Sequence, residues 1–488
     1  MRIWTVAALW TVFFALGSGQ SPNGLSFDPY GTFPSVYWQP AAGLSSPYGW
    51  EFHLGAQGNI DNNYIFVKDA AGLSLTTQIA TADMLEVVSG TQTFTVDDRQ
   101  YEYDYFDDGA ERFGRLEFSF TGPSISFRLG QDWRLGLGTR FRAVGDARDV
   151  DTQLSFYTYD ALPFGSRFTI QAGEGQFASW GEVNLNLARR FIVGAGELGL
   201  GVNLKYLLPL AASRVRVDGQ TTITKVNNSS FALENSNIQV AVTGDLLTDN
   251  PGSITGSGFG LDLGLTYAFG DLIGQDYLPQ FVIGVAILDF GKLEYDQTSE
   301  RHRFSSDFNR IIDTEDYRFE ETDLTAIPSA IEQFNTDVNV DAPTRGSLEG
   351  NGFNLSLPMR TSLSFSYQVD EAIGIDGRVL INTPLGSNAL RGSQVFTTGV
   401  RYSKWWYGGG LNLNFHEFRQ LNLGLYLRAG PFYLGSDRVF GTLLPRDIVA
   451  SGDFYAGFRL HAFKRKTPKS KRRKKRGKGS RYNECYKF

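Results

Sequence analysis

Apolar and polar residues alternate with a period of two along many segments of this chain. From Glu197 to Tyr206, Leu, Val and Tyr occupy every second position, and Glu, Gly, Asn and Lys lie between them. The segment from Phe259 to Phe269 repeats the pattern, with Phe, Leu and Tyr alternating with Gly, Asp, Thr and Ala. A period of two places successive side chains on opposite faces of a β-strand. The pattern therefore predicts an all-β protein whose strands each have one apolar and one polar face.

About fourteen such segments are predicted, with mostly short connections at one end of the strands and mostly long ones at the other. An even number of antiparallel strands with this asymmetry is typical of a transmembrane β-barrel with both termini in the periplasm. Gly, Asn and charged residues opposite the apolar face suit a watery lumen, and aromatic residues near the segment ends suit the membrane interface. We therefore predict a barrel over residues 49–463. Its predicted strands are 49–58, 114–130, 133–143, 177–189, 196–209, 256–268, 278–290, 355–367, 372–382, 394–402, 407–415, 419–428, 430–436 and 452–463.

The long connections are polar and acidic, and are expected to be extracellular loops. The spacing of Leu324, Ile327 and Ile331 predicts one short amphipathic helix over Thr322–Phe334, which we expect to cap the barrel mouth. The predicted long loops are residues 59–113, 144–176, 210–255, 291–354 and 437–451.

The N-terminus has the features of a secretory signal peptide over residues 1–19. Arg2 supplies the positive charge, Ile3–Leu16 is an uncharged and mostly apolar run, and Gly17-Ser18-Gly19 supplies the small residues before cleavage. No later segment reaches the roughly 18 apolar residues that a membrane-spanning helix needs. An exported chain of this kind can span a membrane only as a closed barrel.

The net charge of −6 hides a strong asymmetry along the chain. Residues 464–488 hold 13 Lys and Arg but one acid, whereas residues 20–463 have a net charge of −19. So basic a tail does not fold alone. In the periplasm it would meet anionic headgroups, cell-wall polymer or an acidic protein, or remain a solvated extension; export makes nucleic acid an unsuitable partner. The single Cys485 excludes an intramolecular disulfide, and we expect it to be incidental.

Signals for catalysis or cofactor binding are poor. None of the four His residues has metal-ligand spacing to another His, a Cys or an acid, and no nucleophile elbow or phosphate-binding Gly loop occurs. His53 and His461 are predicted to face the lumen from the first and last strands, as a hydrogen-bonded pair without a catalytic role. We therefore expect no enzyme, no metal and no cofactor.

Many charged residues fall on the predicted inner face. They could form a selectivity lining that guides an anionic solute, or a lattice of ion pairs that fills the lumen; the presence of both signs favours the lattice. The residues are Glu51, Glu117, Arg134, Arg140, Arg142, Glu182, Lys205, Asp262, Arg360, Asp376, Arg378, Arg401, Arg428 and Arg459.

One predicted strand changes phase at Gly122-Pro123. The apolar positions before it and those after it differ by one residue, and Pro lacks the amide that a β-ladder needs. A structural bulge is the simpler interpretation. The alternative is a gap in the wall, a lateral opening through which an apolar solute could leave into the bilayer.

The chain resembles the fatty-acid-transporter-like (FadL and PorV-type) outer-membrane barrels over most of residues 30–463. The resemblance rests on the order of several short motifs along the chain. They are Gln39-Pro40-Ala41, Ser179-Trp180-Gly181-Glu182, Gly258 to Gly264, Ile287 to Gly291, Leu357-Pro358 and Gly435-Ser436-Asp437.

This resemblance implies a fourteen-stranded barrel with an N-terminal plug, for which residues 20–48 are the candidate. Gln39-Pro40-Ala41 stands where the family usually has Asn-Pro-Ala. The implied function is a passive channel for a small apolar solute across the outer membrane. The alternative is an adaptor barrel that anchors a periplasmic or surface protein assembly through its loops and basic tail. Outer-membrane lipid is the expected partner in either case.

Overall fold

The computed structural model describes most of the predicted barrel and the segment before it. The predicted signal peptide, the basic tail and Cys485 lie outside the described residues. Residues described are 24–30, 35–68, 86–87, 93–96, 99–106, 111–151, 162–244, 253–271, 279–306, 310–313, 326–338, 348–439 and 448–461.

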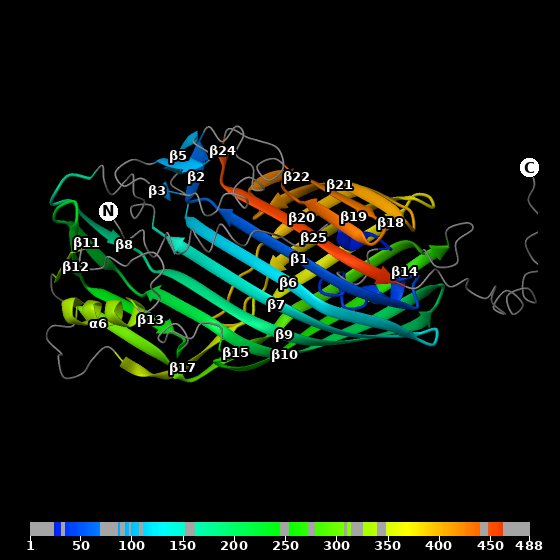
Figure 1. Cartoon of the computed structure of the whole chain (residues 1–488), viewed down its shortest axis with the longest axis horizontal. Helices are drawn as coiled ribbons and strands as arrows, with labels where there is room; N and C mark the ends of the chain where they lie inside the picture. Colours follow the sequence, from blue (N-terminus) through cyan, green and yellow to red (C-terminus); the bar gives the residue numbers. More distant parts are fainter. Residues whose placement is uncertain are drawn as a thin grey trace, which may run out of the picture.

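Fourteen antiparallel strands form a closed ring (Figure 1). The first and last strands pair with each other, from Glu51 opposite His461 to Asp61 opposite Ser451, so the sheet has no open edge. Closure lets the backbone N–H and C=O groups of the first and last strands pair with each other, as a sheet in lipid requires. The strands in chain order are β1 (Trp50–Asn62), β6 (Arg112–Leu129), β7 (Trp133–Val150), β9 (Gly173–Val193), β10 (Gly196–Val217), β14 (Gly256–Asp271), β15 (Pro279–Ser306), β18 (Arg360–Gln368), β19 (Ile373–Asn382), β20 (Val395–Ser403), β21 (Tyr407–His416), β22 (Gln420–Ala429), β23 (Phe432–Ser436) and β25 (Ser451–His461).

The predicted barrel is confirmed, with one strand placed differently. The predicted strand 355–367 is two strands, β17 (Leu348–Ser356) and β18, because the chain breaks at Leu357-Pro358-Met359. Pro cannot continue a β-ladder, and the Leu357 amide instead donates to the Gly291 carbonyl at 3.0 Å.

Several predicted loops are wrong over much of their length, because strands continue beyond the membrane. β7, β9, β10 and β15 extend well into the predicted loops 144–176, 210–255 and 291–354. Outside lipid a strand needs no continuous apolar face, so the period-two signal disappears while the hydrogen-bonded ladder persists.

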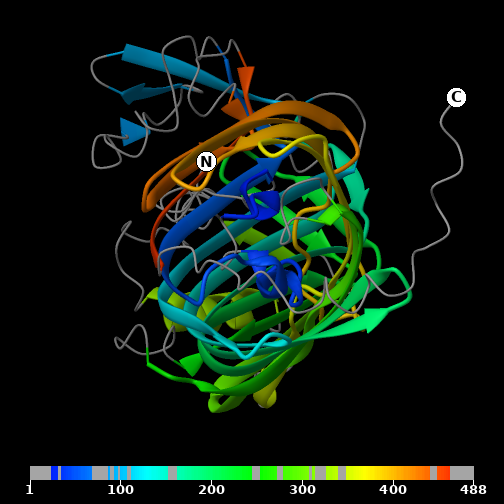
Figure 2. The ribbon, with the colours of Figure 1, turned by 90° about the vertical axis from the view of Figure 1, so that its right-hand side faces the viewer.

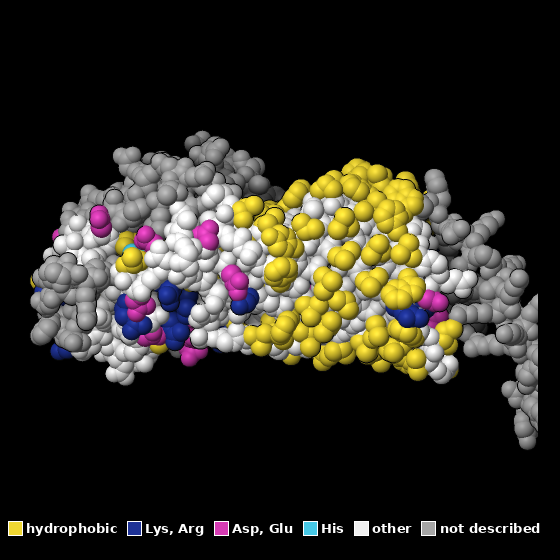
Figure 3. All heavy atoms as spheres, turned by 90° about the horizontal axis from the view of Figure 1, so that it is seen from below, with side chains coloured by type: hydrophobic (Ala, Val, Ile, Leu, Met, Phe, Trp, Pro, Cys, Tyr) yellow, Lys and Arg dark blue, Asp and Glu magenta, His cyan; other side chains and the backbone are white. Residues whose placement is uncertain are grey.

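On the face seen in Figure 3, apolar side chains cover one half of the molecule, and the described surface of the other half is polar and charged. On β10 this apolar belt includes Leu200, Leu204 and Tyr206, which are 41%, 53% and 44% exposed, while Asn203 and Lys205 between them are buried. So large a continuous apolar surface is what a barrel presents to lipid. In the part of the chain that the structure describes, no helix is long and apolar enough to cross a membrane.

Two small sheets and a helix stand at the long-loop end of the barrel (Figure 1). One helix is described in the predicted region, α6 (Ala326–Val338), which covers the described part of the predicted helix 322–334 and continues to Val338. It packs with the second sheet on a separate apolar core that includes Phe168, Ile223, Phe304 and Val338. The first sheet consists of β2 (Ile65–Lys68), β3 (Glu86–Val87), β4 (Thr93–Val96), β5 (Arg99–Tyr105) and β24 (Ile448–Val449). The second sheet consists of β8 (Arg167–Ile170), β11 (Thr221–Lys225), β12 (Ser230–Glu234) and β16 (Arg310–Asp313). A further strand, β13 (Ser236–Val242), pairs with β10 and β15.

The described part of the chain before β1 lies inside the ring of strands (Figure 2). This part, residues 24–30 and 35–48, is called the N-terminal segment below. It contains two short 3₁₀ helices, Leu25–Phe27 and Ala42–Ser45, and contributes no strand to the sheets. Most of its side chains are buried, so it fills space that the wall alone would leave open.

Candidate functional site

The N-terminal segment is bound to the inner wall by polar side chains that reach its backbone. Asn186 of β9 donates to the Pro40 carbonyl at 3.0 Å, and Asn203 of β10 donates to the Val36 carbonyl at 3.1 Å. In the opposite direction, the Gln39 amide donates to the carbonyls of Leu265 and Val285 at 3.2 Å each. Inward-facing amides therefore satisfy a backbone that has no ladder of its own.

Glycines on three neighbouring strands make room for Gln39-Pro40-Ala41. A Cβ atom on Gly201 of β10 would lie 2.3 Å from the Ala41 nitrogen, and one on Gly264 of β14 would lie 2.1 Å from the Gln39 Oε1. On β15, a Cβ atom on Gly284 would lie 2.7 Å from the Gln39 Nε2. The candidate plug motif thus lies against a wall without side chains, where any larger residue would clash.

Five wall arginines each face an aromatic ring of the N-terminal segment. A guanidinium carbon 4.7–5.5 Å from a ring centroid is in the range of a cation–π contact. The pairs are Arg140 with Tyr37, Arg360 with Trp38, Arg378 with Phe27, Arg428 with Tyr30 and Arg459 with Tyr48.

A carboxylate anchors the start of the same segment. Asp28 is fully buried and accepts hydrogen bonds from Arg428 Nε at 2.7 Å and from Ser403 Oγ at 2.5 Å. The amide of Tyr30 also donates to Asp28, at 2.9 Å. Arg428 therefore binds a carboxylate with its edge and an aromatic ring with its face.

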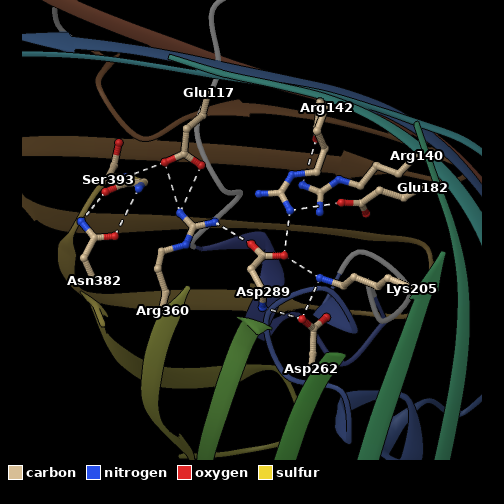
Figure 4. Close-up of polar contacts among 12 residues, drawn as sticks. Glu117, Arg140, Arg142, Glu182, Lys205, Asp262, Asp289, Arg360, Asn382 and Ser393 are labelled. Carbon is tan, nitrogen blue, oxygen red and sulfur yellow. Dashed lines mark hydrogen bonds and ion pairs between the residues drawn. The ribbon is translucent and has the colours of Figure 1, made fainter. Parts of the chain in front are cut away.

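A cluster of paired charges lies beside the segment (Figure 4). Asp289 is its centre, 2.8 Å from Arg142 Nη1, 2.6 Å from Lys205 Nζ and 3.8 Å from Arg360 Nη2. Lys205 also contacts Asp262 at 2.7 Å. Buried charges are tolerated only when paired in this way.

The fourteen charged residues predicted to face inward are buried or nearly so. Eleven of them form ion pairs, with one another or with other inward carboxylates. The other three, Arg140, Arg378 and Arg459, have no carboxylate oxygen within 4.0 Å in the described chain, and each faces an aromatic ring instead. The lumen is thus occupied chiefly by an ion-pair lattice.

Sequence reasoning missed Asp289, because a bulge changes the phase of β15. Ile283, Val285 and Ile287 face lipid, but Asp289 turns inward with a φ of 57° and Phe290 takes the lipid-facing position. The pairing with β14 is irregular nearby. An apolar Phe290 out of step with the preceding residues is the signal that could have indicated the bulge.

The connection between β19 and β20, residues 383–394, crosses the lumen and is called the cross-lumen loop below. From the β19 side of the barrel it reaches the opposite wall, where Asn59 of β1 donates to Ser393 Oγ at 2.8 Å. The amide of Ser393 donates to Glu117 of β6, and Arg148 of β7 donates to the Ala389 carbonyl at 3.3 Å. The loop therefore bridges the barrel on the long-loop side of the N-terminal segment.

Leu390 inserts this loop into an apolar cluster inside the barrel. The side chain is completely buried among inward residues that include Val144, Trp180, Leu293 and Leu355. The loop thus has a hydrophobic anchor of its own, in addition to its hydrogen bonds to the walls.

Gly122-Pro123, the candidate wall kink, lies within the continuous strand β6. The two residues oppose the single residue Thr139 on β7, and the pairing with β1 shifts at the same level. Both neighbouring strands pair with β6 on either side of this point. A small space lined by Tyr37, His53 and other residues lies inside the wall here and has room for about one water molecule.

Each of the two inward histidines has an aromatic partner. His53 hydrogen-bonds Tyr433 at 2.5 Å, whereas His461 stacks on Tyr48 with ring centroids 3.8 Å apart. Among the described residues, no group of three or more His, Cys, Asp or Glu side chains could hold a metal ion.

Beyond the apolar belt, ion pairs continue around the rim of the barrel. Glu174 of β9 contacts Arg148, and Arg214 Nε lies 2.6 Å from its other oxygen. Burial favours the neutral acid, but the hydrogen bonds and charges of these two arginines outweigh it and lower the pKa of Glu174 from its ordinary value of 4.5.

A closed fourteen-stranded wall, an apolar belt and a filled polar lumen define a transmembrane β-barrel of the outer-membrane class. Residues 61–437 match the model of the family described as "Family of unknown function (DUF5723)", and the chain belongs to that family. No protein of curated function matches it.

The solved structures that match include a toluene transporter, a FadL homologue and a monoaromatic hydrocarbon channel. The toluene transporter TodX of Pseudomonas putida is 9% identical, covers 91% of this chain and 94% of its own, and has a TM-score of 0.27. A FadL homologue of Pseudomonas aeruginosa is 8% identical, with coverages of 92% and 98% and a TM-score of 0.26. The CymD monoaromatic hydrocarbon channel is 11% identical, with coverages of 92% and 95% and a TM-score of 0.30. The strand pairing described above, rather than these TM-scores, establishes the fold.

Proposed function

We propose that this protein is a gated outer-membrane channel for a small solute with an apolar body, and that the N-terminal segment is the plug that closes it. One observation carries the proposal: the segment fills the lumen without joining the wall. Its contacts are side-chain hydrogen bonds, glycine contacts and arginine–aromatic contacts, which can separate without breaking any strand pairing.

The proposed exit is lateral, at Gly122-Pro123. The bulge interrupts the regular ladder of β6, and Tyr37 of the N-terminal segment lines the space just inside it. Withdrawal of Tyr37 would enlarge that space next to the bulge in the wall. The axial route is less suitable for an apolar solute, because the charged lattice and the cross-lumen loop lie along it.

The orientation and the absence of catalysis belong to the same proposal. With signal peptide 1–19 removed, both termini would lie at the short-turn end, in the periplasm, and the basic tail 464–488 would extend from β25 there. We assign no catalytic residue, metal or cofactor.

Conductance across planar lipid bilayers tests the channel. The protein lacking residues 20–48 should conduct at least about tenfold more than the intact protein, because removal of the plug leaves a wider aqueous path. Uptake of a fluorescent apolar probe into vesicles should rise in parallel, and replacement of Pro123 by Thr, which restores a ladder donor, should reduce uptake but not conductance. An unchanged conductance after the deletion would overturn the proposal.

The second candidate is an adaptor barrel, favoured by the cross-lumen loop and the paired charges. In an adaptor, these two features would together keep the lumen closed without the N-terminal segment. In that case the deletion would leave the barrel sealed, and removal of residues 464–488 would release proteins that co-purify with the intact chain from outer membranes in mild detergent.

A further inference from the structure

We propose that Arg428 and Ser403 form a binding site for an aromatic carboxylate, which Asp28 and Tyr30 of the N-terminal segment occupy as an internal substitute for the ligand. The inference deepens the proposed gating function and rests on it, because it names the chemical class of the solute that would displace the plug.

The site is built to recognise a carboxylate. Arg428 is 3% exposed, and its Nε donates to Asp28 Oδ2 at 2.7 Å. Ser403 Oγ donates to the other oxygen, Asp28 Oδ1, at 2.5 Å. Two wall donors thus bind both oxygens of one carboxylate, and a charge-assisted arrangement of this kind is the strong form of such a contact.

The same arginine is held by a scaffold that does not depend on the N-terminal segment. Arg428 Nη2 donates to the Lys404 carbonyl at 2.7 Å and to Ser403 Oγ at 3.2 Å, and Nη1 donates to the Trp405 carbonyl at 3.3 Å. All of these partners lie in the connection between β20 and β21 or at its edge. The guanidinium therefore stays in place when Asp28 leaves, so the site is preorganised.

An aromatic ring completes the arrangement. The Tyr30 ring centroid lies 5.5 Å from the Arg428 guanidinium carbon, while the Asp28 carboxylate lies at the guanidinium edge. Two residues of the segment thus present what one small molecule could present alone: a negatively charged carboxylate beside an aromatic face. The other wall arginines that face aromatic rings extend the same preference along the lumen.

Removal of the segment would leave the wall positively charged at this end. Arg428 has its one ion pair with Asp28, which belongs to the segment, and Arg378 and Arg459 have no carboxylate within 4.0 Å among the described residues. Buried cations without a counter-charge attract an anion. The flat faces of the arginine guanidinium groups favour an anion that also carries an aromatic ring. A fully apolar hydrocarbon would leave these charges unpaired.

The test is calorimetric titration of phenylacetate into the full-length protein in detergent. Asp28→Asn removes the internal carboxylate, so this variant should bind phenylacetate about tenfold more tightly than the wild type. Cyclohexylacetate lacks the aromatic face and benzyl alcohol lacks the charge, and each should bind the variant about fivefold more weakly than phenylacetate. Asp370→Asn, at an exposed turn of the same end, is the matched control and should behave as the wild type.

A second variant separates loss of the site from loss of folding. In Asp28→Asn with Arg428→Gln, both members of the ion pair are neutral, so no buried charge is left without a partner; heat-modifiable mobility on gels reports barrel folding. The folded double variant should lose the phenylacetate binding of the single variant. Equal binding by the wild type and Asp28→Asn, or by Asp28→Asn and the double variant, would overturn the proposal. Equal affinity for cyclohexylacetate would overturn its aromatic part.

The outcomes also separate this proposal from the gating function. If the deletion variant conducts but the Asp28→Asn protein does not bind phenylacetate, the channel proposal would stand and the carboxylate-site proposal would be overturned. If Asp28→Asn binds phenylacetate tightly but the deletion variant does not conduct, the carboxylate site would be supported and the channel proposal would be overturned.

Discussion

The N-terminal segment and the cross-lumen loop both fill the same lumen, yet they are attached in different ways. The segment is held by wall side chains that contact its backbone carbonyls and its aromatic rings. The loop begins and ends in adjacent strands, hydrogen-bonds to the opposite wall and buries Leu390 in an apolar cluster. We therefore infer that the segment can leave the barrel, whereas the loop is a fixed part of it.

This difference indicates which of the two can move. Releasing the segment exposes arginine faces and carbonyls that water can solvate, and it leaves the strand pairing intact. Releasing the loop also exposes Leu390 and opens a cavity among Val144, Trp180 and Leu293, which costs hydrophobic free energy in addition. We therefore expect substitutions in the loop to destabilise the barrel. Substitutions in the wall residues that contact the segment should release the segment alone.

The largest expected effect is at Asp289, the centre of the charged cluster, whose partner Arg360 contacts Trp38 of the segment. Asp289→Asn leaves Arg142 and Lys205 with less compensation and should lower the free energy of unfolding by about 3–5 kcal/mol, as measured by guanidinium titration in micelles. Asp296→Asn, an exposed carboxylate on the same strand, is the control and should change it by less than about 1 kcal/mol. Equal effects of the two variants would contradict a central role for Asp289.

The anchor of the cross-lumen loop gives the next effect. Leu390→Ala should destabilise the whole barrel by about 2–5 kcal/mol in the same titration, because it leaves a cavity in a buried apolar cluster. Leu385→Ala lies in the same loop with 44% of its side chain exposed and should cost much less. A loop that moves freely would show no difference between them.

A substitution in the glycine wall that contacts the N-terminal segment should have a different effect. Gly201→Val places a side chain where Pro40 and Ala41 now lie, and should shift the segment at a cost of about 1–3 kcal/mol. Limited proteolysis should then cleave before residue 48 while the barrel stays folded on gels. Gly175→Val, whose added Cβ meets nothing within 4 Å, serves as the control. Unfolding of the barrel in place of release would show that the segment is part of the wall.

The smallest effect is on pH dependence at the rim. Because the pKa of Glu174 is lowered in the folded protein, its ion pairs stabilise the fold above the ordinary value of 4.5, and this contribution is lost as the pH falls through the lowered pKa. The wild type should therefore lose more stability than Glu174→Gln between pH 6 and about 3 in urea titrations. Parallel curves for the two proteins would show that Glu174 is not held as a carboxylate.

The agreement between predicted and observed strands depends on whether a strand lies in lipid or in water. Within the membrane every predicted strand has its counterpart, since lipid on one side and polar contacts on the other enforce the alternation. Beyond the membrane, β2 to β5, β8 and β11 to β13 stand where loops were expected, and α6 continues four residues past the predicted end of its helix. There the ladder is kept by hydrogen bonds and a local core, which leave no periodic signal.

The alternating sequence by itself determined the strand count and which face of each strand meets lipid, because those properties depend on neighbours within one strand. Only the tertiary structure decided what fills the lumen. Asp28 meets Arg428 across 400 positions of chain, and Asn59 meets Ser393 across 334. Such contacts arise when the ring closes and brings opposite walls together, and no local pattern encodes a partner that far away.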